Sequence, residues 1–349
     1  MKIVSVIGHF GCDKTLLNGQ TVKTKVITEE LQRRFGSENL EKYDTCGGWK
    51  TILKAPSQVI SALKYSENVL IFPAHNGLRV YGPLLSFLRN FFKNRKIHYV
   101  VIGGWLPEFL KERKWLAGTL KKFDGIYVET SAMLSALKDM GFDNVCVMPN
   151  CKKLSVLSKG ELIYPEEVPY KLCTFSRVMK EKGIKNAVDA IKNVNKKLGY
   201  TAFALDIYGQ VDTNQIEWFE TLKSSFPEEV RYCGCVDADK STDVLRNYFA
   251  LLFPTRFYTE GIPGTIIDAY AAGIPVISAK WENYADIIVE GSTGVGYEFD
   301  NQKEFESVLL GVAQNPKKIL DMKENCISKA KEYMPEVAIK VLVEKIVGA

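Results

Sequence analysis

Short apolar runs, bounded by turn residues, alternate along most of the chain with longer stretches of helical periodicity. In the first half these runs cover residues 2–8, 68–74, 98–104, 125–130 and 144–149. A second series covers residues 171–177, 203–209, 230–236, 248–254, 274–278 and 295–299. Continuous apolar runs suit strands buried on both faces, and the helical stretches suit the crossovers between them. The pattern therefore predicts βαβ units and parallel sheets.

The two series predict two domains. A chain of 349 residues is too long for one ordinary core, and the Pro-containing stretch 164–169 separates the series. We predict a first domain over residues 1–165 and a second over residues 166–330. A charged helical segment, residues 331–349, is expected to pack back on the first domain. Ligands of such sheets bind beyond the carboxyl ends of the strands, so the loops that follow the strands are where chemistry is expected.

Composition is that of a soluble globular protein, with 46% apolar and 25% charged residues. No apolar run is long enough to span a bilayer, and the opening MKIVSVIGHFG suits a buried strand better than a signal peptide. We therefore expect a cytoplasmic protein. The eight cysteines are scattered without CxxC spacing and are interpreted as reduced thiols. Three histidines offer little material for a metal centre.

Positive charge is concentrated in the first half of the chain. Residues 1–150 hold 21 Lys and Arg against 13 Asp and Glu, and residues 79–122 hold ten against two. Aromatic side chains, among them Phe91, Phe92, Phe109 and Trp115, lie between these cations. The segment suits the headgroup boundary of an anionic membrane, where a lipid-linked substrate would be found. An ordinary amphipathic helix with its aromatics in the core is the alternative. No binding module for nucleic acid is recognisable.

The stretch 259–278, TEGIPGTIIDAYAAGIPVIS, joins two carboxylates through a Gly/Pro-rich turn. A helix that begins just after the turn would carry Asp268 about two turns inside it, so Glu260 and Asp268 could face one ligand. Gly261 and Gly264 allow close approach of the backbone, and the unpaired N–H groups of the first helical turn favour anionic oxygens. A phosphate-bearing ligand with hydroxyls is one interpretation. A buried helix with both acids as solvated caps is the other.

Two segments resemble a known family. Residues 253–278 resemble the signature of the retaining nucleotide-sugar glycosyltransferases of the GT-B architecture, specifically family 4, the glycosyl transferases group 1. Residues 175–191 resemble the Arg-x4-Lys-Gly element of that family, here Arg177, Lys182 and Gly183. Residues 148–150 and 205–210 fit in order, and residues 17–31 occupy the place of the glycine-rich loop and its helix. The second acid of the signature is usually glutamate, whereas this chain has Asp268, which keeps the charge with a shorter reach.

The resemblance implies an α/β protein with two Rossmann-like doubly wound domains facing across a cleft, an acceptor-side domain first and a nucleotide-sugar-binding domain second. It implies that Arg177 and Lys182 stabilise the charge of the leaving diphosphate, that Glu260 contacts the donor sugar and that Asp268 accepts from the ribose hydroxyls. His75 is expected near the donor sugar, where it would orient a hydroxyl or pass a proton. Solvated surface cations and a loop histidine with a local hydrogen bond are the alternatives.

The resemblance also implies a donor-binding set drawn from both domains. In the first domain the phosphates are expected to meet Gly19, Gln20 and Thr21. In the second, the contacts are expected from Gly209, Gly234, Val236, Gly261, Ile262, Pro263, Gly264, Thr265 and Asp268. Asp237 and Asp239 imitate a metal-binding carboxylate pair, but the architecture is metal-independent, so we favour a solvated turn and expect neither metal nor cofactor.

We therefore expect a retaining glycosyltransferase that moves a hexose or N-acetylhexosamine from a UDP- or GDP-sugar to a saccharide or lipid-linked saccharide. Bacterial-type surface glycan synthesis, such as that of capsule or O-antigen, at the inner face of the cell membrane, would suit it. No residue is an obvious nucleophile, so a phosphate oxygen of the donor is expected to take the proton of the acceptor. A sugar-nucleotide 2-epimerase of the same architecture and a non-catalytic sugar-nucleotide-binding subunit are the alternatives.

Overall fold

The computed structural model describes residues 1–11, 19–47 and 49–348, and the chain divides into two compact units. The first unit holds Met1–Lys153 and the residues from Tyr333 onward, and the second holds Leu154–Glu332. The boundary predicted after residue 165 thus falls after Lys153 instead. Leu157 gives the reason, because its side chain is buried and its backbone N–H donates to the carbonyl of Ala271 at 2.9 Å, in the second unit.

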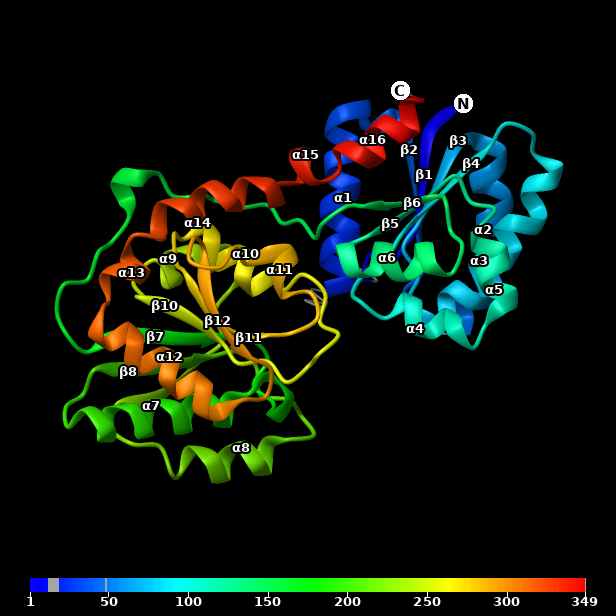
Figure 1. Cartoon of the computed structure of the whole chain (residues 1–349). Coiled ribbons are helices and arrows are strands. Elements are labelled where there is room, and N and C mark those ends of the chain that lie inside the picture. The colour runs from blue at the N-terminus through cyan, green and yellow to red at the C-terminus, as the bar shows by residue number, and fades with distance from the viewer. Residues whose placement is uncertain (12–18, 48, 349) are drawn as a thin grey trace. The chain divides into compact units, whose positions relative to one another are not determined.

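The first unit is built on a six-stranded sheet in the order β2-β1-β3-β4-β5-β6, with every neighbouring pair parallel (Figure 1). Its strands are β1 (Lys2–Gly8), β2 (Leu40–Asp44), β3 (Ser66–Ile71), β4 (Lys96–Val100), β5 (Gly125–Val128) and β6 (Val145–Val147). Its helices are α1 (Gly19–Phe35), α2 (Trp49–Tyr65), α3 (His75–Leu88), α4 (Leu106–Lys111), α5 (Lys114–Leu120), α6 (Ser131–Asp139), α15 (Pro335–Ala338) and α16 (Lys340–Val347).

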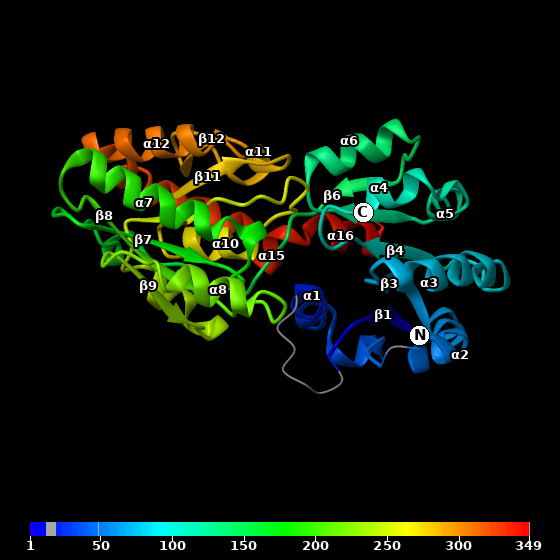
Figure 2. The same ribbon diagram turned by 90° about the horizontal axis from the view of Figure 1, so that it is seen from below.

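Helices cover both faces of this sheet. One core joins the sheet to α2, α3, α4, α5 and α6, and includes Leu78, Leu116 and Leu137. The other joins it to α1, α15 and α16, where Ile27 packs in the same cluster as Leu342. The C-terminal helices therefore belong to the first unit, and they lie beside α1 in both views of the ribbon (Figures 1 and 2).

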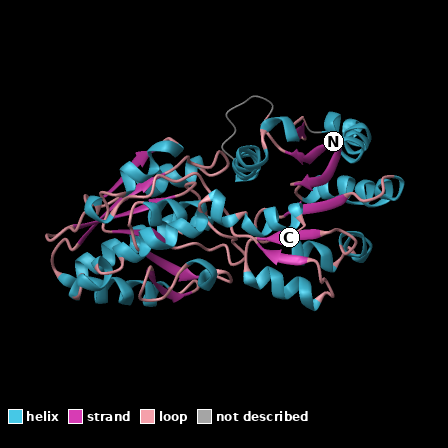
Figure 3. Ribbon diagram, turned by 90° about the horizontal axis from the view of Figure 1, so that it is seen from above, coloured by secondary structure: helices cyan, strands magenta, loops and turns pink. Residues whose placement is uncertain are grey.

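The second unit has the same plan, a six-stranded parallel sheet in the order β12-β11-β10-β7-β8-β9. Its strands are β7 (Tyr170–Phe175), β8 (Phe203–Tyr208), β9 (Val230–Gly234), β10 (Ala250–Phe253), β11 (Val276–Lys280) and β12 (Gly294–Glu298). Its helices are α7 (Ile184–Leu198), α8 (Ile216–Lys223), α9 (Ser241–Leu245), α10 (Gly264–Ala271), α11 (Tyr284–Ile287), α12 (Gln302–Gln314), α13 (Lys317–Leu320) and α14 (Lys323–Ala330). Figure 3 shows helices on both sides of the strands.

The predicted fold class is confirmed, since each unit is a doubly wound parallel α/β sheet. Each predicted apolar run overlaps a strand. The pattern missed strand β2, at the edge of the first sheet. This strand is only partly buried, so its sequence, LEKYD, includes charged residues and is not an apolar run. Among the residues that the structure describes, no helix is both long and apolar enough to cross a membrane.

Candidate functional site

One edge of the second sheet gathers the residues that the sequence singled out in that unit. Strands β10, β7, β8 and β9 are consecutive neighbours and parallel, so their carboxyl ends lie together. Arg177 follows β7, Gly209 follows β8, Gly234 ends β9, and the turn that carries Glu260 follows β10. The alternation of strands and helices is thus enough to bring four separate segments to one edge.

Arg177 and Lys182 lie in the turn between β7 and α7, in different surroundings. The Arg177 side chain is 59% exposed, and its guanidinium is 3.5 Å from the carboxylate of Asp212. Lys182 ends a short 3-10 helix, Lys180–Lys182, and is mostly buried, with its ammonium 5.3 Å from the centroid of the Phe257 ring. Gly183 follows with φ 68°, and a Cβ atom there would lie 1.8 Å from the carbonyl oxygen of Pro254, so only glycine lets the two loops meet.

Glu260 is paired directly with Lys182. The two side chains form an ion pair, and both are largely buried, at 17% and 16% exposed. The second carboxylate oxygen of Glu260 accepts from the hydroxyl of Thr255 at 2.9 Å. The backbone carbonyl of Glu260 accepts from the indole of Trp281 at 3.0 Å and from the side-chain amide of Asn283 at 2.6 Å. Four contacts therefore fix Glu260 at this edge.

The N-terminus of α10 lies three residues beyond Glu260. Its N-cap, Pro263, provides no side-chain cap, and the first turn contains no acidic residue. The turn residues Gly261, Ile262, Pro263, Gly264 and Thr265 thus lead into a helix N-terminus without a side-chain cap, the kind of helix end at which anions bind. Asp268 is only 5% exposed and is the fifth residue of α10. It lies about one turn inside the helix, not two as expected, because the helix begins only at Gly264.

The glycines after β8 and β9 are required by the backbone. Gly209 has φ 133°, and a Cβ atom there would lie 1.8 Å from the carbonyl oxygen of Ser176. Its N–H donates to the carbonyl of Gly234 at 2.8 Å, and its own carbonyl accepts from the Tyr232 hydroxyl at 2.9 Å. Gly234 has φ 76°, and Val236 follows it, half-buried. These contacts tie the two loops together next to Arg177.

No metal site is evident in the part of the chain that the structure describes, where no group of three His, Cys, Asp or Glu side chains could hold an ion. Asp237 and Asp239 are exposed on the turn before α9. Other charged groups at this edge include the Lys182–Glu260 pair, and Arg177 with its partner Asp212.

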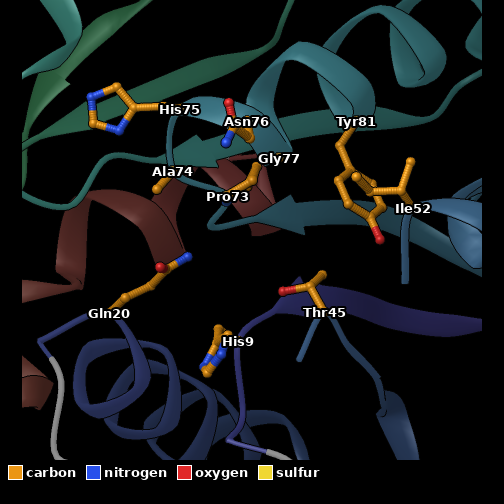
Figure 4. Close-up of a pocket in the computed structure, with 10 residues that line it drawn as sticks. All are labelled: His9, Gln20, Thr45, Ile52, Pro73, Ala74, His75, Asn76, Gly77 and Tyr81. Atoms are coloured by element: carbon orange, nitrogen blue, oxygen red, sulfur yellow. The ribbon is translucent and has the colours of Figure 1, made fainter. Parts of the chain in front are cut away.

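The first unit contains a pocket of about 450 Å³. Figure 4 shows its wall, formed by the loop after β1, the start of α1, the turn after β2, α2 and the start of α3. The described residues that line it are His9, Gln20, Thr45, Ile52, Pro73, Ala74, His75, Asn76, Gly77 and Tyr81. Two predicted site residues, Gln20 and His75, are therefore brought together here.

The other first-unit residues of the predicted set lie at the start of α1. Gly19 is the first residue of that helix, and Thr21 is buried with its hydroxyl oxygen 2.8 Å from Nδ1 of His9. The amide of Gln20 donates to the carbonyl of Phe72 at 3.1 Å. Leu17 and Asn18, from the segment compared with the glycine-rich loop, lie outside the described residues.

His75 is held by an aromatic stack. Its ring lies 3.9 Å from the ring centroid of Trp105 and 5.1 Å from that of Phe109. The guanidinium of Arg113 lies over Phe109 at 4.1 Å. Burial and, secondarily, the charge of Arg113 lower the pKa of His75, so the imidazole is neutral at physiological pH.

The first unit contains a buried ion pair that the sequence analysis did not predict. Lys23 in α1 and Glu129 after β5 are 2.6 Å apart, and both are almost fully buried. Lys23 also donates to the carbonyl of Val101 at 3.3 Å. The partners are separated by 106 residues, so no local pattern could have found the pair.

The expectation of reduced thiols is wrong for Cys46, which is disulfide-bonded. Cys12 lies outside the described residues. Free thiols are present at Cys146, Cys151, Cys173, Cys233, Cys235 and Cys326. Without CxxC spacing, a disulfide between cysteines that only the fold brings together cannot be predicted from the sequence.

Comparison with known proteins finds a family match over the second unit, where the candidate site lies. Residues 169–315 match the family model of the glycosyl transferases group 1. A 2-deoxystreptamine N-acetyl-D-glucosaminyltransferase from Niallia circulans is 24% identical over 285 residues, which cover 80% of this chain and 68% of that protein.

Solved structures share the fold over most or all of the chain. HepE of Anabaena, in complex with UDP, superposes with a TM-score of 0.75 at 13% identity and covers 100% of both chains. TarM has a TM-score of 0.66 at 16% identity, where 85% of this chain matches only 58% of the TarM chain. Residues 169–315 thus resemble the glycosyl transferases group 1, and the chain as a whole has the GT-B fold.

Proposed function

We propose that the protein is a retaining glycosyltransferase that transfers a hexose or N-acetylhexosamine from a UDP- or GDP-sugar to a saccharide or lipid-linked saccharide, in the synthesis of a bacterial-type surface glycan. The observation that supports this most directly is the arrangement at the edge of the second sheet. Lys182, Glu260 and the uncapped N-terminus of α10 follow adjacent strands there. A cation, a carboxylate and open N–H groups are what a diphosphate joined to a sugar needs.

In this proposal each group has a distinct role. Arg177 binds the diphosphate through the several N–H donors of its planar guanidinium, and Lys182 binds it through its ammonium charge. Both stabilise the negative charge that grows on the diphosphate as the glycosidic bond breaks. The backbone N–H groups of Gly264 and Thr265, at the start of α10, add to this stabilisation. Glu260 contacts the donor sugar, and Asp268 accepts from the ribose. A phosphate oxygen of the donor takes the acceptor proton, so we propose that the reaction needs neither an enzyme nucleophile nor a metal ion.

The relatives suggest where to begin with the donor. HepE was crystallised with UDP, and the curated relative is named for N-acetyl-D-glucosaminyl transfer. We therefore propose UDP-N-acetylglucosamine and UDP-glucose as the first donors to test, with the GDP-sugars as the comparison.

The test combines ligand binding with the stereochemistry of the product. Thermal unfolding of the purified protein is measured with UDP, GDP and their sugar derivatives, because a ligand that binds only the folded state raises the melting temperature. We expect a rise with one nucleotide family that is lost in Arg177→Ala and Lys182→Ala. Arg256→Ala is the matched control, since Arg256 is half exposed and paired with Asp300.

Product analysis then decides between the reactions that one site could support. Incubation with the donor that binds and an acceptor panel should yield a glycoside with the anomeric configuration of the donor, observed by proton NMR. An inverted product would overturn retention. Consumption of donor alone with a change at C2 would indicate an epimerase, and binding without any turnover would indicate a non-catalytic subunit.

We also propose that the basic segment 79–122 contacts an anionic membrane surface at the inner face of the cell membrane. Phe87 and Phe91 are 62% and 70% exposed, and Trp115 is 56% exposed, within a segment rich in Lys and Arg. The full chain should float with vesicles that contain anionic phosphatidylglycerol and not with neutral phosphatidylcholine vesicles. Phe91→Ser should weaken the flotation, whereas Tyr200→Ser, an exposed aromatic of the second unit, should not.

A further inference from the structure

The turn between β11 and α11 packs on the loop that carries Glu260. The backbone N–H of Glu282 in this turn donates to the carbonyl of Tyr258 at 3.0 Å. The side chains on either side of it both donate to the backbone carbonyl of Glu260, the indole of Trp281 at 3.0 Å and the amide of Asn283 at 2.6 Å. Trp281 and Asn283 are almost fully buried, at 2% and 1% exposed. One turn therefore provides two buried donors for a single carbonyl.

These two donors fix the plane of the peptide bond between Glu260 and Gly261. Among the described residues the one cis peptide bond is Val168–Pro169, so this bond is trans, and its C=O and N–H point in opposite directions. Because the carbonyl is turned toward buried side chains, the N–H of Gly261 is turned away from them. No hydrogen bond joins that N–H to another of the described residues, and Gly261 is only half-buried.

Asn283 provides its donor at a cost to the fold. Its Oδ1 is buried and has no hydrogen-bond partner in the described part of the chain, and an unsatisfied buried oxygen is destabilising. A leucine, which has a similar size, would bury no unpaired oxygen. Stability alone therefore does not account for an asparagine here, and a buried group of this kind calls for another explanation.

We propose that Trp281 and Asn283 are positioning residues that turn the N–H of Gly261 toward the sugar-nucleotide donor, where it donates to an oxygen of the diphosphate. This inference rests on the proposed function and adds two residues to its site. The residue before Gly261 is Glu260, whose carboxylate is paired with Lys182, the cation assigned to the phosphates. An N–H that is oriented before the reaction stabilises the charge that develops on the leaving diphosphate. Rotation of the peptide plane would present the carbonyl oxygen instead, which would repel that charge.

Two substitutions remove the donors. Trp281→Phe keeps a ring beside Phe253, whose centroid lies 5.3 Å from that of Trp281, and removes the indole N–H. Asn283→Leu keeps the approximate size and removes both the amide donor and the unpaired oxygen. The double variant should lower kcat roughly tenfold to a hundredfold and change the KM of the donor by less than about threefold, because the contact strengthens only as the diphosphate gains charge.

The same turn provides a matched control. Tyr284→Phe removes the hydrogen bond from its hydroxyl to Glu290 at 2.6 Å and leaves both donors to the Glu260 carbonyl in place. This variant should keep the kcat of the wild type. An equal loss of kcat in Tyr284→Phe would show that the turn only supports the fold, and it would overturn the proposal.

Amide NMR on the full chain follows the N–H of Gly261 directly. Addition of UDP should move its proton resonance downfield in the wild type and in Tyr284→Phe, and much less in the double variant. A double variant that binds UDP and transfers sugar like the wild type refutes this inference alone, as does a Gly261 resonance that stays in place while UDP raises the melting temperature. If the wild type neither binds a nucleotide nor transfers sugar, the proposed function fails and this inference fails with it.

Discussion

The Lys182–Glu260 ion pair implies that Glu260 competes with a diphosphate for the same cation. In the structure the Glu260 carboxylate is paired with the Lys182 ammonium, which in the proposal binds the donor phosphates. The donor must then displace Glu260 from Lys182, which frees the carboxylate for the sugar. Glu260→Gln removes the competing charge while it keeps the size of the side chain and the hydrogen bond with Thr255. We therefore expect this variant to bind UDP more tightly although it transfers sugar more slowly.

The magnitude follows from the burial of the pair. Exposed ion pairs contribute about 0–1 kcal/mol, and breaking a fully buried pair costs about 3–5 kcal/mol. With 16% and 17% of the two side chains exposed, the pair lies between these limits, at about 1–2 kcal/mol. Release of Lys182 by the substitution should therefore lower the Kd of UDP roughly 5- to 30-fold.

The assay is isothermal titration of UDP into four proteins, namely the wild type, Glu260→Gln, Lys182→Met and the double variant. Lys182→Met should weaken binding, and Glu260→Gln should gain nothing in that background, because the competition requires the lysine. Asp300→Asn is the control, a carboxylate-to-amide change in the exposed pair with Arg256. An equal gain in both backgrounds would refute the competition and leave only long-range charge repulsion. A loss of affinity in Glu260→Gln would refute it outright.

Three further predictions concern stability. Burial lowers the pKa of Lys323 to about 8 from 10.5. Between these two pH values the unfolded chain binds more protons than the folded one, so the free energy of unfolding rises with pH. Lys323→Met should abolish this rise and increase the free energy of unfolding at pH 7 by up to about 3 kcal/mol, measured by urea titration. Gly183→Ala should destabilise by more than about 1 kcal/mol because φ is positive and the Cβ atom clashes, whereas Gly311→Ala, in open space on α12, should be neutral or stabilising in the same titration. Lys23→Met should lower the free energy of unfolding by about 3–5 kcal/mol, because it removes the cation that balances the buried carboxylate of Glu129. Adding Glu129→Gln should recover part of that loss, and full additivity in a double-mutant cycle would contradict the pairing.

The sequence by itself predicted the two parallel sheets and the loops that form the candidate site at one edge of the second sheet. This was possible because strands buried on both faces are continuous apolar runs, and because the carboxyl ends of parallel strands all lie at the same edge of the sheet. Arg177, Gly209 and Gly234 could thus be placed at that edge from their positions after the runs alone. The half-buried edge strand β2 has no such run and was missed.

Tertiary structure decided the contacts between distant segments. The pairing of Lys182 with Glu260 spans 78 residues, and that of Lys23 with Glu129 spans 106. The stacking of His75 on Trp105, the disulfide at Cys46 and the depth of Asp268 in α10 likewise depend on how elements pack and where a helix begins. Hydrophobic periodicity records which face of an element is buried, but it does not record which polar group on another element will lie opposite, because that depends on packing across the whole unit.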